Sequence, residues 1–205
     1  MLRNIIFDYG KVLVDWDPHY LFDPYFKDPE ECRHVLHDVL NADFHNAGDL
    51  GRPIADVEKE WSAKYPEYAW AIHLYYADFE KTVRGEIPGM YDLVKELKAN
   101  GFHVYGLSNW SWETHQKIRH KCPVFGLLEG EVISGLVHMI KPHPDIYQYC
   151  LDTYKLRPEE SVFIDDRQVN IDGAEAVGIH GLLFHDAATL RKDLKALSES
   201  LRQEI

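Results

Sequence analysis

Carboxylate, hydroxyl and amide side chains stand directly after three short apolar runs of the sequence, and a lysine precedes the third run. If these runs are parallel strands of one sheet, their carboxyl ends meet at a single edge, and the side chains converge there. Converging carboxylates repel one another unless a cation or a lysine compensates their charge. The residues concerned are Asp8 after residues 4–7, Ser108 and Asn109 after residues 102–107, Lys141, and Asp165 and Asp166 after residues 161–164.

A ligand set made only of oxygen atoms favours a hard cation. Mg²⁺ suits a site with two carboxylates, a backbone carbonyl, water molecules and a substrate phosphate. The pattern therefore predicts Mg²⁺-dependent phosphoryl chemistry at this edge. The alternative is an acidic sheet edge with several helix caps, because Asp, Ser and Asn are also the favoured residues in turns and at helix N-caps.

The elements that would position these side chains follow from the apolar pattern. From about residue 86 onward, helical stripes alternate with short apolar runs, which is typical of a parallel sheet covered on both faces. We predict an α/β fold with a doubly wound, Rossmann-like parallel sheet as its core. The predicted strands are 4–7, 102–107, 161–164 and 180–184, and the predicted helices are 89–100, 146–154, 169–177 and 188–201.

A second region interrupts this alternation just after the first strand. Residues 15 to about 84 lack strand-like runs and are rich in Trp and Tyr, which indicates packed amphipathic helices. We predict a core of residues 1–14 and 86–205 and a small α-helical cap domain, the insert, of residues 15–85. An insert leaving from the carboxyl edge would cover the site and open at its two crossings, near residues 15–18 and 84–88.

Composition limits the partners and the compartment. The chain has 22 basic and 34 acidic residues and a net charge of −12, and its basic residues do not cluster, so we expect no nucleic-acid or membrane binding. Cys32, Cys122 and Cys150 have neither disulfide nor metal-ligand spacing, which favours the cytoplasm. No apolar stretch is long enough for a leader or a membrane span. We expect a monomer or a weak dimer.

Four segments, taken in order, resemble the motifs of the haloacid dehalogenase-like hydrolase superfamily. Within it, the chain most resembles the bacterial sugar-phosphate phosphatases of the glucose 1-phosphate type, which carry a helical cap. With the insert included, the resemblance covers essentially the whole chain. The segments are Ile5 to Asp15, Leu107-Ser108-Asn109, Ile140-Lys141-Pro142 and Val162 to Asp166.

The resemblance implies a Mg²⁺-dependent phosphatase that acts on a small phosphorylated metabolite through an aspartyl-phosphate intermediate. It implies that the nucleophile lies next to the metal and that hydroxyl, amide and ammonium groups hold the phosphate. The implied catalytic residues are Asp8, Ser108 and Lys141. The implied phosphate-binding residues are Ser108, Asn109 and Lys141, and the implied metal ligands are Asp8, the Gly10 carbonyl, Asp166 and, directly or through water, Asp165.

One position departs from the superfamily pattern. Most of its phosphatases carry a second aspartate two residues after the nucleophile, which protonates the leaving group, whereas this chain has Gly10. Glycine cannot transfer a proton, although its carbonyl can bind a metal. The sugar-phosphate phosphatases that the chain resembles share this glycine. The general acid is therefore unassigned, and the sequence candidates for it are Asp15, Asp17, His45 or another histidine of the insert, and His143.

Two other functions stay open. A 2-haloacid dehalogenase would resemble this chain, but its first motif is one residue longer between nucleophile and glycine, and it has no use for the acidic pair Asp165-Asp166. A phosphate-binding regulatory domain that has lost its general acid is the non-enzymatic alternative. The substrate is not specified, although Trp16, His45 and Trp110 stand where residues at the edge of a pocket, or packing residues, would stand.

Overall fold

The computed structural model describes residues 1–203. Its strands are β1 Asn4–Phe7, β2 Val14–Trp16, β3 Val83–Glu86, β4 His103–Ser108, β5 Gly130–Ile133, β6 Ser161–Asp165 and β7 His180–Leu183. Its helices are α1 His19–Phe22, α2 Pro29–His34, α3 Ala42–Asp49, α4 Ile54–Lys64, α5 Ala69–Ala77, α6 Met90–Ala99, α7 Trp112–Ile118, α8 Ser134–Val137, α9 Pro144–Tyr154, α10 Gln168–Glu175 and α11 Ala187–Gln203. Short 3-10 turns and one π-helical turn, Val35–Val39, join some of them.

The main sheet is parallel and has the strand order β5-β4-β1-β6-β7. β1 is its central strand, and Phe7 pairs with Gly106 of β4 on one side and with Ile164 of β6 on the other. The carboxyl ends of these three strands therefore lie in line. The predicted parallel sheet is confirmed, and its register brings the residues that follow β1, β4 and β6 to one edge.

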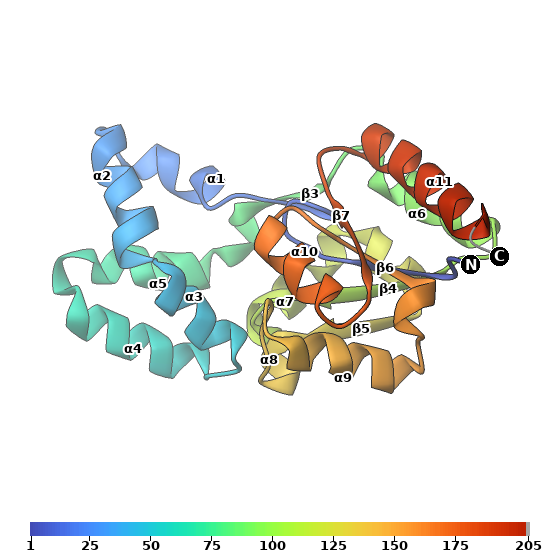
Figure 1. The fold of residues 1–205 in the computed structure, drawn as a ribbon. Coiled ribbons are helices and arrows are strands. Elements are labelled where there is room, and N and C mark those ends of the chain that lie inside the picture. The colour runs from blue at the N-terminus through green and yellow to red at the C-terminus, as the bar shows by residue number, and fades with distance from the viewer. Residues whose placement is uncertain (204–205) are drawn as a thin grey trace.

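Helices cover both faces of this sheet because the side chains of a strand alternate in direction. Ile5 and Phe7 belong to the apolar cluster that includes α6 and α11, whereas Ile6 belongs to the cluster formed with α9 and α10. Figure 1 shows α6 and α11 on one side of the sheet and α9 on the other. All three β1 side chains are fully buried, as expected for a strand of a doubly wound fold.

Three strands differ from the sequence expectation. β2 and β3 form an antiparallel pair where the chain leaves and re-enters the core, so the prediction of no strand in residues 15–84 was wrong at both of its ends. β5, at the edge of the main sheet, was not predicted either. These strands have three or four residues and include charged or glycine positions, so they lack an apolar pattern of their own.

Between β2 and β3 the chain forms α1 to α5, which extend away from the sheet in Figure 1. Their aromatic side chains pack together, as the composition indicated: Phe44 lies 5.6, 5.4 and 5.2 Å, between ring centroids, from Trp61, Tyr75 and Tyr76. The β2-β3 pair spans both predicted boundaries of the insert. The division into residues 1–14 and 86–205 on one side and 15–85 on the other stays a prediction.

The insert also contacts the core at a point remote in sequence from the β2-β3 pair. His138 Nδ1 donates to the Leu50 carbonyl over 2.8 Å, and the Ile54 amide donates to Glu113 Oε1 over 2.9 Å. Gly51 has a φ of +86°, and a Cβ atom there would lie only 2.6 Å from the Gly135 carbonyl oxygen. Glycine at this position therefore allows the turn between α3 and α4 to lie directly against the core.

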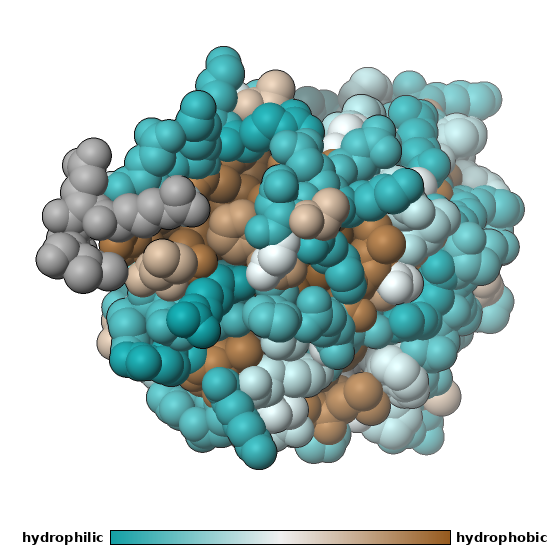
Figure 2. Space-filling model, turned by 90° about the vertical axis from the view of Figure 1, so that its right-hand side faces the viewer, coloured by the Kyte–Doolittle hydropathy of each residue, from teal (hydrophilic) through white to brown (hydrophobic). Residues whose placement is uncertain are grey.

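The surface is consistent with the excess of charged residues. From the end opposite the insert, Figure 2 shows a largely hydrophilic face in which apolar side chains appear between polar ones. Among the helices of residues 1–203, none has both the length and the apolar content that crossing a bilayer requires.

One histidine lies in the core rather than on the surface. His115 is fully buried, with its ring 5.7 Å from that of Tyr9 and 5.3 Å from that of Phe125. Burial lowers the pKa of His115 to about 4, although Glu131, 3.6 Å away, partly opposes this shift. The folded protein therefore holds the ring neutral in a pH range where an exposed imidazole takes up a proton.

This histidine predicts a pH dependence of stability. The His115 pKa is about 4 in the folded protein and 6.5 ordinarily. The contribution of the neutral His115 ring to the free energy of unfolding is therefore present above pH 6.5 and is lost as pH falls towards 4. Full loss amounts to about 3 kcal/mol at ~1.4 kcal/mol per pKa unit. We expect His115→Phe to lose less unfolding free energy than the wild type between pH 6.5 and 4.5, as measured by urea denaturation. His143→Gln, at an exposed side chain, is the control, and equal slopes for wild type and His115→Phe would contradict the prediction.

Candidate active site

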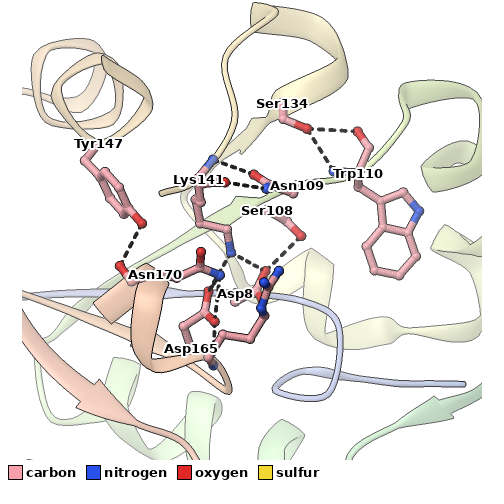
Figure 3. Close-up of polar contacts among 10 residues, drawn as sticks. Asp8, Ser108, Asn109, Trp110, Ser134, Lys141, Tyr147, Asp165 and Asn170 are labelled. Carbon is pink, nitrogen blue, oxygen red and sulfur yellow. Dashed lines mark hydrogen bonds and ion pairs between the residues drawn. The ribbon is translucent and has the colours of Figure 1, made fainter. Parts of the chain in front are cut away.

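The ends of the three central strands bring the predicted residues together. Asp8 follows β1, and its amide continues the strand pairing by donating to the Ile164 carbonyl over 2.9 Å. Ser108 ends β4, and its Oγ donates to Asp8 Oδ1 over 2.9 Å. Asp165 ends β6. Figure 3 shows these side chains directed towards one another at the sheet edge.

Lys141 lies between two buried carboxylates. Its Nζ atom is 2.8 Å from Asp8 Oδ1 and 2.7 Å from Asp165 Oδ2. Burial raises the pKa of Asp8, and Lys141 opposes this rise. Burial alone would lower the pKa of Lys141, but the two carboxylates outweigh it and raise that pKa. The ammonium therefore stays charged, and each buried charge has a partner of opposite sign.

The backbone of Lys141 is held by Asn109. The Lys141 amide donates to Asn109 Oδ1 over 2.8 Å, and Asn109 Nδ2 donates to the Lys141 carbonyl over 3.0 Å. This reciprocal pair fixes the loop before α9 against the end of β4, as Figure 3 shows. The Asn109 side chain thus positions Lys141, which leaves the Asn109 backbone amide as its group for an anion.

The two adjacent aspartates after Ile164 have different surroundings. Asp165 is fully buried, and it accepts hydrogen bonds from Lys141, from the Arg167 amide over 2.9 Å and from Asn170 Nδ2, 3.0 Å from both its oxygens. Asp166 is only partly buried and lies in the wall of the cavity described below. Asp165 is therefore engaged with Lys141, whereas Asp166 lies in the cavity wall.

The oxygen atoms at this edge fit a hard divalent cation. One carboxylate oxygen from each of Asp8, Asp165 and Asp166 lies within 4.8 Å of the others. Burial and the Asp165 charge raise the pKa of Asp166, so a nearby cation would stabilise its ionised form. Gly10 lies in the same cavity wall, next to Asp8 in the chain. The donor set is that expected for Mg²⁺, with Asp8 and Asp166 best placed to bind it.

A cavity of about 580 Å³ opens at this edge between the core and the insert. From the core, its wall includes Asp8, Gly10, Ser108, Asn109, Lys141 and Asp166. From the insert, it includes Trp16, Asp17, His45, Asp49 and Tyr75. The insert therefore completes the site and does not merely lie beside it.

The three residues expected at the edge of the pocket, Trp16, His45 and Trp110, all contribute to this wall. They also pack against one another: the Trp16 ring meets those of His45 and Trp110 edge to face, with centroids 6.1 and 6.4 Å apart. The pocket and packing interpretations of these residues both apply. These contacts join aromatic side chains of the insert and of the core into one wall of the cavity.

The sequence candidates for the general acid are not equivalent. Within residues 1–203, the cavity wall includes Asp17, His45 and two other histidines of the insert, His19 and His37, but neither Asp15 nor His143. Asp15 accepts a hydrogen bond from the Tyr20 hydroxyl, and His143 is exposed. Asp17 Oδ1 accepts from the His19 amide over 2.9 Å, which is a capping contact. Burial lowers the pKa of His45 to about 4, so its ring carries no acidic proton near neutral pH.

Sequence reasoning did not single out Asp49, although it is a carboxyl group in the cavity wall. Asp49 is the last residue of α3, and burial raises its pKa to about 7. The sequence marks this position only as the start of the Gly- and Pro-containing stretch 48–53. Nothing in that local pattern shows that the helix ends over the site.

The buried charges predict the effect of removing the ammonium. We expect Lys141→Met to destabilise the fold by about 3–5 kcal/mol at pH 7, because it leaves Asp8 and Asp165 buried without a counterion. The double variant Lys141→Met/Asp165→Asn should regain part of this loss. Urea denaturation of the single and double variants measures both effects. A Lys141→Met protein as stable as the wild type would show that the cluster does not need this charge.

Comparison with known proteins agrees with the motifs. The chain belongs to the haloacid dehalogenase-like hydrolase family, whose model matches residues 4–178. A sesquiterpene phosphatase of Aspergillus oryzae is 27% identical over 95% of this chain and 96% of its own length. The D-ribitol-5-phosphate phosphatase of Bacteroides thetaiotaomicron is 23% identical over 98% of this chain and 100% of its own. Some other relatives are longer, and the chain spans less than half of their length. A haloacid dehalogenase of Burkholderia cepacia also matches, at 21% identity.

A solved structure shows the same fold. A HAD family enzyme from Bacteroides thetaiotaomicron, in complex with magnesium and inorganic phosphate, superposes with a TM-score of 0.70 at 20% sequence identity. The match covers 91% of this chain and 96% of that chain. The prediction of family and fold from the sequence motifs is thus confirmed.

Proposed function

We propose that this hydrolase is a Mg²⁺-dependent phosphatase that acts on a small phosphorylated metabolite, with a sugar phosphate as the substrate class. The observation that carries the proposal is the position of Asp8. Its carboxylate stands in the cavity wall between the Lys141 ammonium and Ser108 on one side and the acidic residue Asp166 on the other. The phosphatases among the relatives, one of them acting on D-ribitol 5-phosphate, support this function.

In the proposed reaction, a carboxylate oxygen of Asp8 attacks the phosphorus atom in line with the bond to the leaving oxygen. That bond breaks, and an aspartyl phosphate forms on Asp8. Water then attacks the phosphorus of the aspartyl phosphate, which regenerates the Asp8 carboxylate and releases inorganic phosphate. Ser108, the Asn109 amide and Lys141 hold the phosphate oxygens, and their fixed positions lower the barrier because charge builds up on these oxygens.

The proposed metal ligands are Asp8, the Gly10 carbonyl and Asp166. Asp165 is not proposed as a direct ligand, because its oxygens already accept hydrogen bonds from Lys141, Asn170 and the Arg167 amide. Bound Mg²⁺ would neutralise charge between the phosphate dianion and the attacking carboxylate. Lys141 does the same from the opposite side.

The cavity supports a small polar substrate. Its volume of about 580 Å³ is within the range of small-molecule sites, and its wall closes over the nucleophile. Aromatic rings of Trp16 and Trp110 can contact the apolar face of a sugar, while Asn46 and Asp17 offer polar groups for its hydroxyls. A folded protein does not fit such a cavity.

The partly buried Asp166 favours a phosphatase over a dehalogenase. Burial and the Asp165 charge raise the pKa of Asp166, so a cation bound there would stabilise its ionised form, whereas displacement of halide from carbon has no use for a cation. A regulatory domain that only binds phosphate would keep the same geometry. Sustained turnover separates that function from catalysis.

The nucleophile is tested by Asp8→Asn. We expect it to lower phosphate release from a panel of sugar phosphates by at least ~1000-fold, because an amide does not attack phosphorus. The measurement is inorganic phosphate released over hours in the presence of Mg²⁺. Asp43→Asn, on the exposed side of α3, is the matched control and should leave the rate unchanged. An Asp8→Asn protein with wild-type turnover would refute the assignment.

The metal site is tested without turnover. We expect Mg²⁺ to raise the melting temperature of the wild type, because a ligand that binds only the folded state stabilises it. Asp166→Asn should weaken Mg²⁺ binding at least ~10-fold by isothermal titration calorimetry. Asp172→Asn, at an exposed acid on α10, is the control. Equal Mg²⁺ affinity in wild type and Asp166→Asn would rule out Asp166 as a ligand.

A further inference from the structure

The insert contributes the carboxyl group of Asp49 to the cavity wall, and the reaction proposed above gives this group no role. Asp49 ends α3 and lies in the wall of the same cavity as Asp8, Gly10 and Lys141. Its side chain is close enough to both Asp8 and Lys141 for their charges to influence its pKa. Asp49 therefore shares the cavity in which a phosphate ester bound at Asp8 would lie.

Asp49 is held in place by the contact between the insert and the core. A Cβ atom at Gly48 would lie 3.5 Å from Ser111 Cβ, so the end of α3 runs directly beside the loop that follows Ser108 and Asn109. The hydrogen bond from His138 to the Leu50 carbonyl fixes the next residue to the core. The backbone on both sides of Asp49 is thus fixed against the core.

The surroundings of Asp49 suit a group that both gives and takes a proton. Burial raises its pKa to about 7, the Ser111 amide and Lys141 oppose this rise, and Asp8 adds to it. Near neutral pH both protonation states are therefore populated, which is the condition for efficient general acid and base catalysis. His45 on the same helix and Tyr75 and Tyr76 on α5 are neutral neighbours in the cavity wall, because burial lowers the pKa of His45 and raises those of both tyrosines. The other charged or titratable side chains of this wall are Lys11, Asp17, His19, His37, Asp166 and Arg167.

We propose that Asp49 is the general acid and base of this enzyme and supplies the proton transfer that Gly10 cannot. The inference rests on the proposed phosphatase function and assigns a step within it. Of the other acidic candidates, Asp17 also lies in the cavity wall, but one of its carboxylate oxygens already accepts a hydrogen bond from the His19 amide over 2.9 Å.

Asp49 gives up one proton in the first step of the reaction and takes one back in the second. As Asp8 attacks the phosphorus and the bond to the leaving oxygen breaks, the Asp49 carboxylic acid gives its proton to that oxygen, which leaves as an alcohol. In the second step the Asp49 carboxylate takes a proton from water as the water oxygen bonds to phosphorus. The bond between phosphorus and Asp8 then breaks, inorganic phosphate is released, and Asp49 is again protonated.

The leaving group provides the test, because a general acid matters most where the leaving oxygen is strongly basic. We expect Asp49→Asn to lower the phosphorylation rate about 10²- to 10⁴-fold with glucose 6-phosphate, and less than ~10-fold with 4-nitrophenyl phosphate. Phenyl phosphate, with an intermediate leaving group, should fall between them. Asp43→Asn on the same helix is the matched control and should follow the wild type on all three esters.

A second variant restores the acid from the other side of the cavity. A Cβ atom at Gly10 would lie 3.8 Å from the Trp110 ring, an ordinary contact, so the backbone there accepts a side chain. We expect Asp49→Asn/Gly10→Asp to regain at least ~10-fold of the lost rate with glucose 6-phosphate. Binding of beryllium fluoride with Mg²⁺, equal in wild type and Asp49→Asn, would show that the Asp8 site is intact.

Two results overturn the inference while leaving the phosphatase function in place. One is an Asp49→Asn protein with wild-type rates on all three esters. The other is an equal loss on all three, which would assign Asp49 to structure or to substrate binding. A wild-type protein that binds beryllium fluoride but releases no phosphate from any ester would instead refute the proposed function, and the inference with it.

Discussion

The buried ammonium of Lys141 is the interaction on which the rest of the site depends. Two carboxylates, Asp8 and Asp165, come from neighbouring strand ends, and the parallel sheet gives them no freedom to move apart. Lys141 lies between them and offsets their repulsion with a charge of opposite sign. Asn109 and Asn170 then fix the lysine loop and the second carboxylate. Asp8 is thereby left with one side held and the other open to the cavity.

The sequence predicted those strands and helices whose apolar pattern can be recognised without knowing which other element they pair with. β1, residues 4–7, was predicted with its observed ends, because a strand buried on both faces has a continuous apolar run. The helix α6 was predicted to within a residue from its apolar stripe and the Asn100-Gly101 stop. β2, β3 and β5 exist because a partner strand supplies their hydrogen bonds. Val83–Glu86 and Gly130–Ile133 contain glycine and charged residues that no local pattern assigns to a sheet.

The residues of the site divide in the same way, into those that the local sequence places and those that tertiary contacts place. Asp8, Ser108 and Asp166 could be predicted because each stands at the end of a strand or directly after it, and the carboxyl ends of neighbouring parallel strands lie at one edge. The position of Asp165 could also be predicted, but its role could not, since its engagement with Lys141 and Asn170 depends on side-chain directions. Asp49 lies at the end of a helix in the insert. Its place over Asp8 depends on how α3 lies against Ser111, which is a tertiary contact between segments some 60 residues apart.

The turn at Gly51 has a mechanical consequence. If the β2-β3 pair were its sole attachment, the insert could rotate as a body about its two crossings to the core, as expected from the sequence. The bonds from His138 to Leu50 and from Ile54 to Glu113 attach it at a third point away from that axis. Rotation about β2 and β3 then requires these bonds to break. Because Asp49 directly precedes Leu50 in the chain, an insert that broke these bonds and rotated would also carry Asp49 away from Asp8.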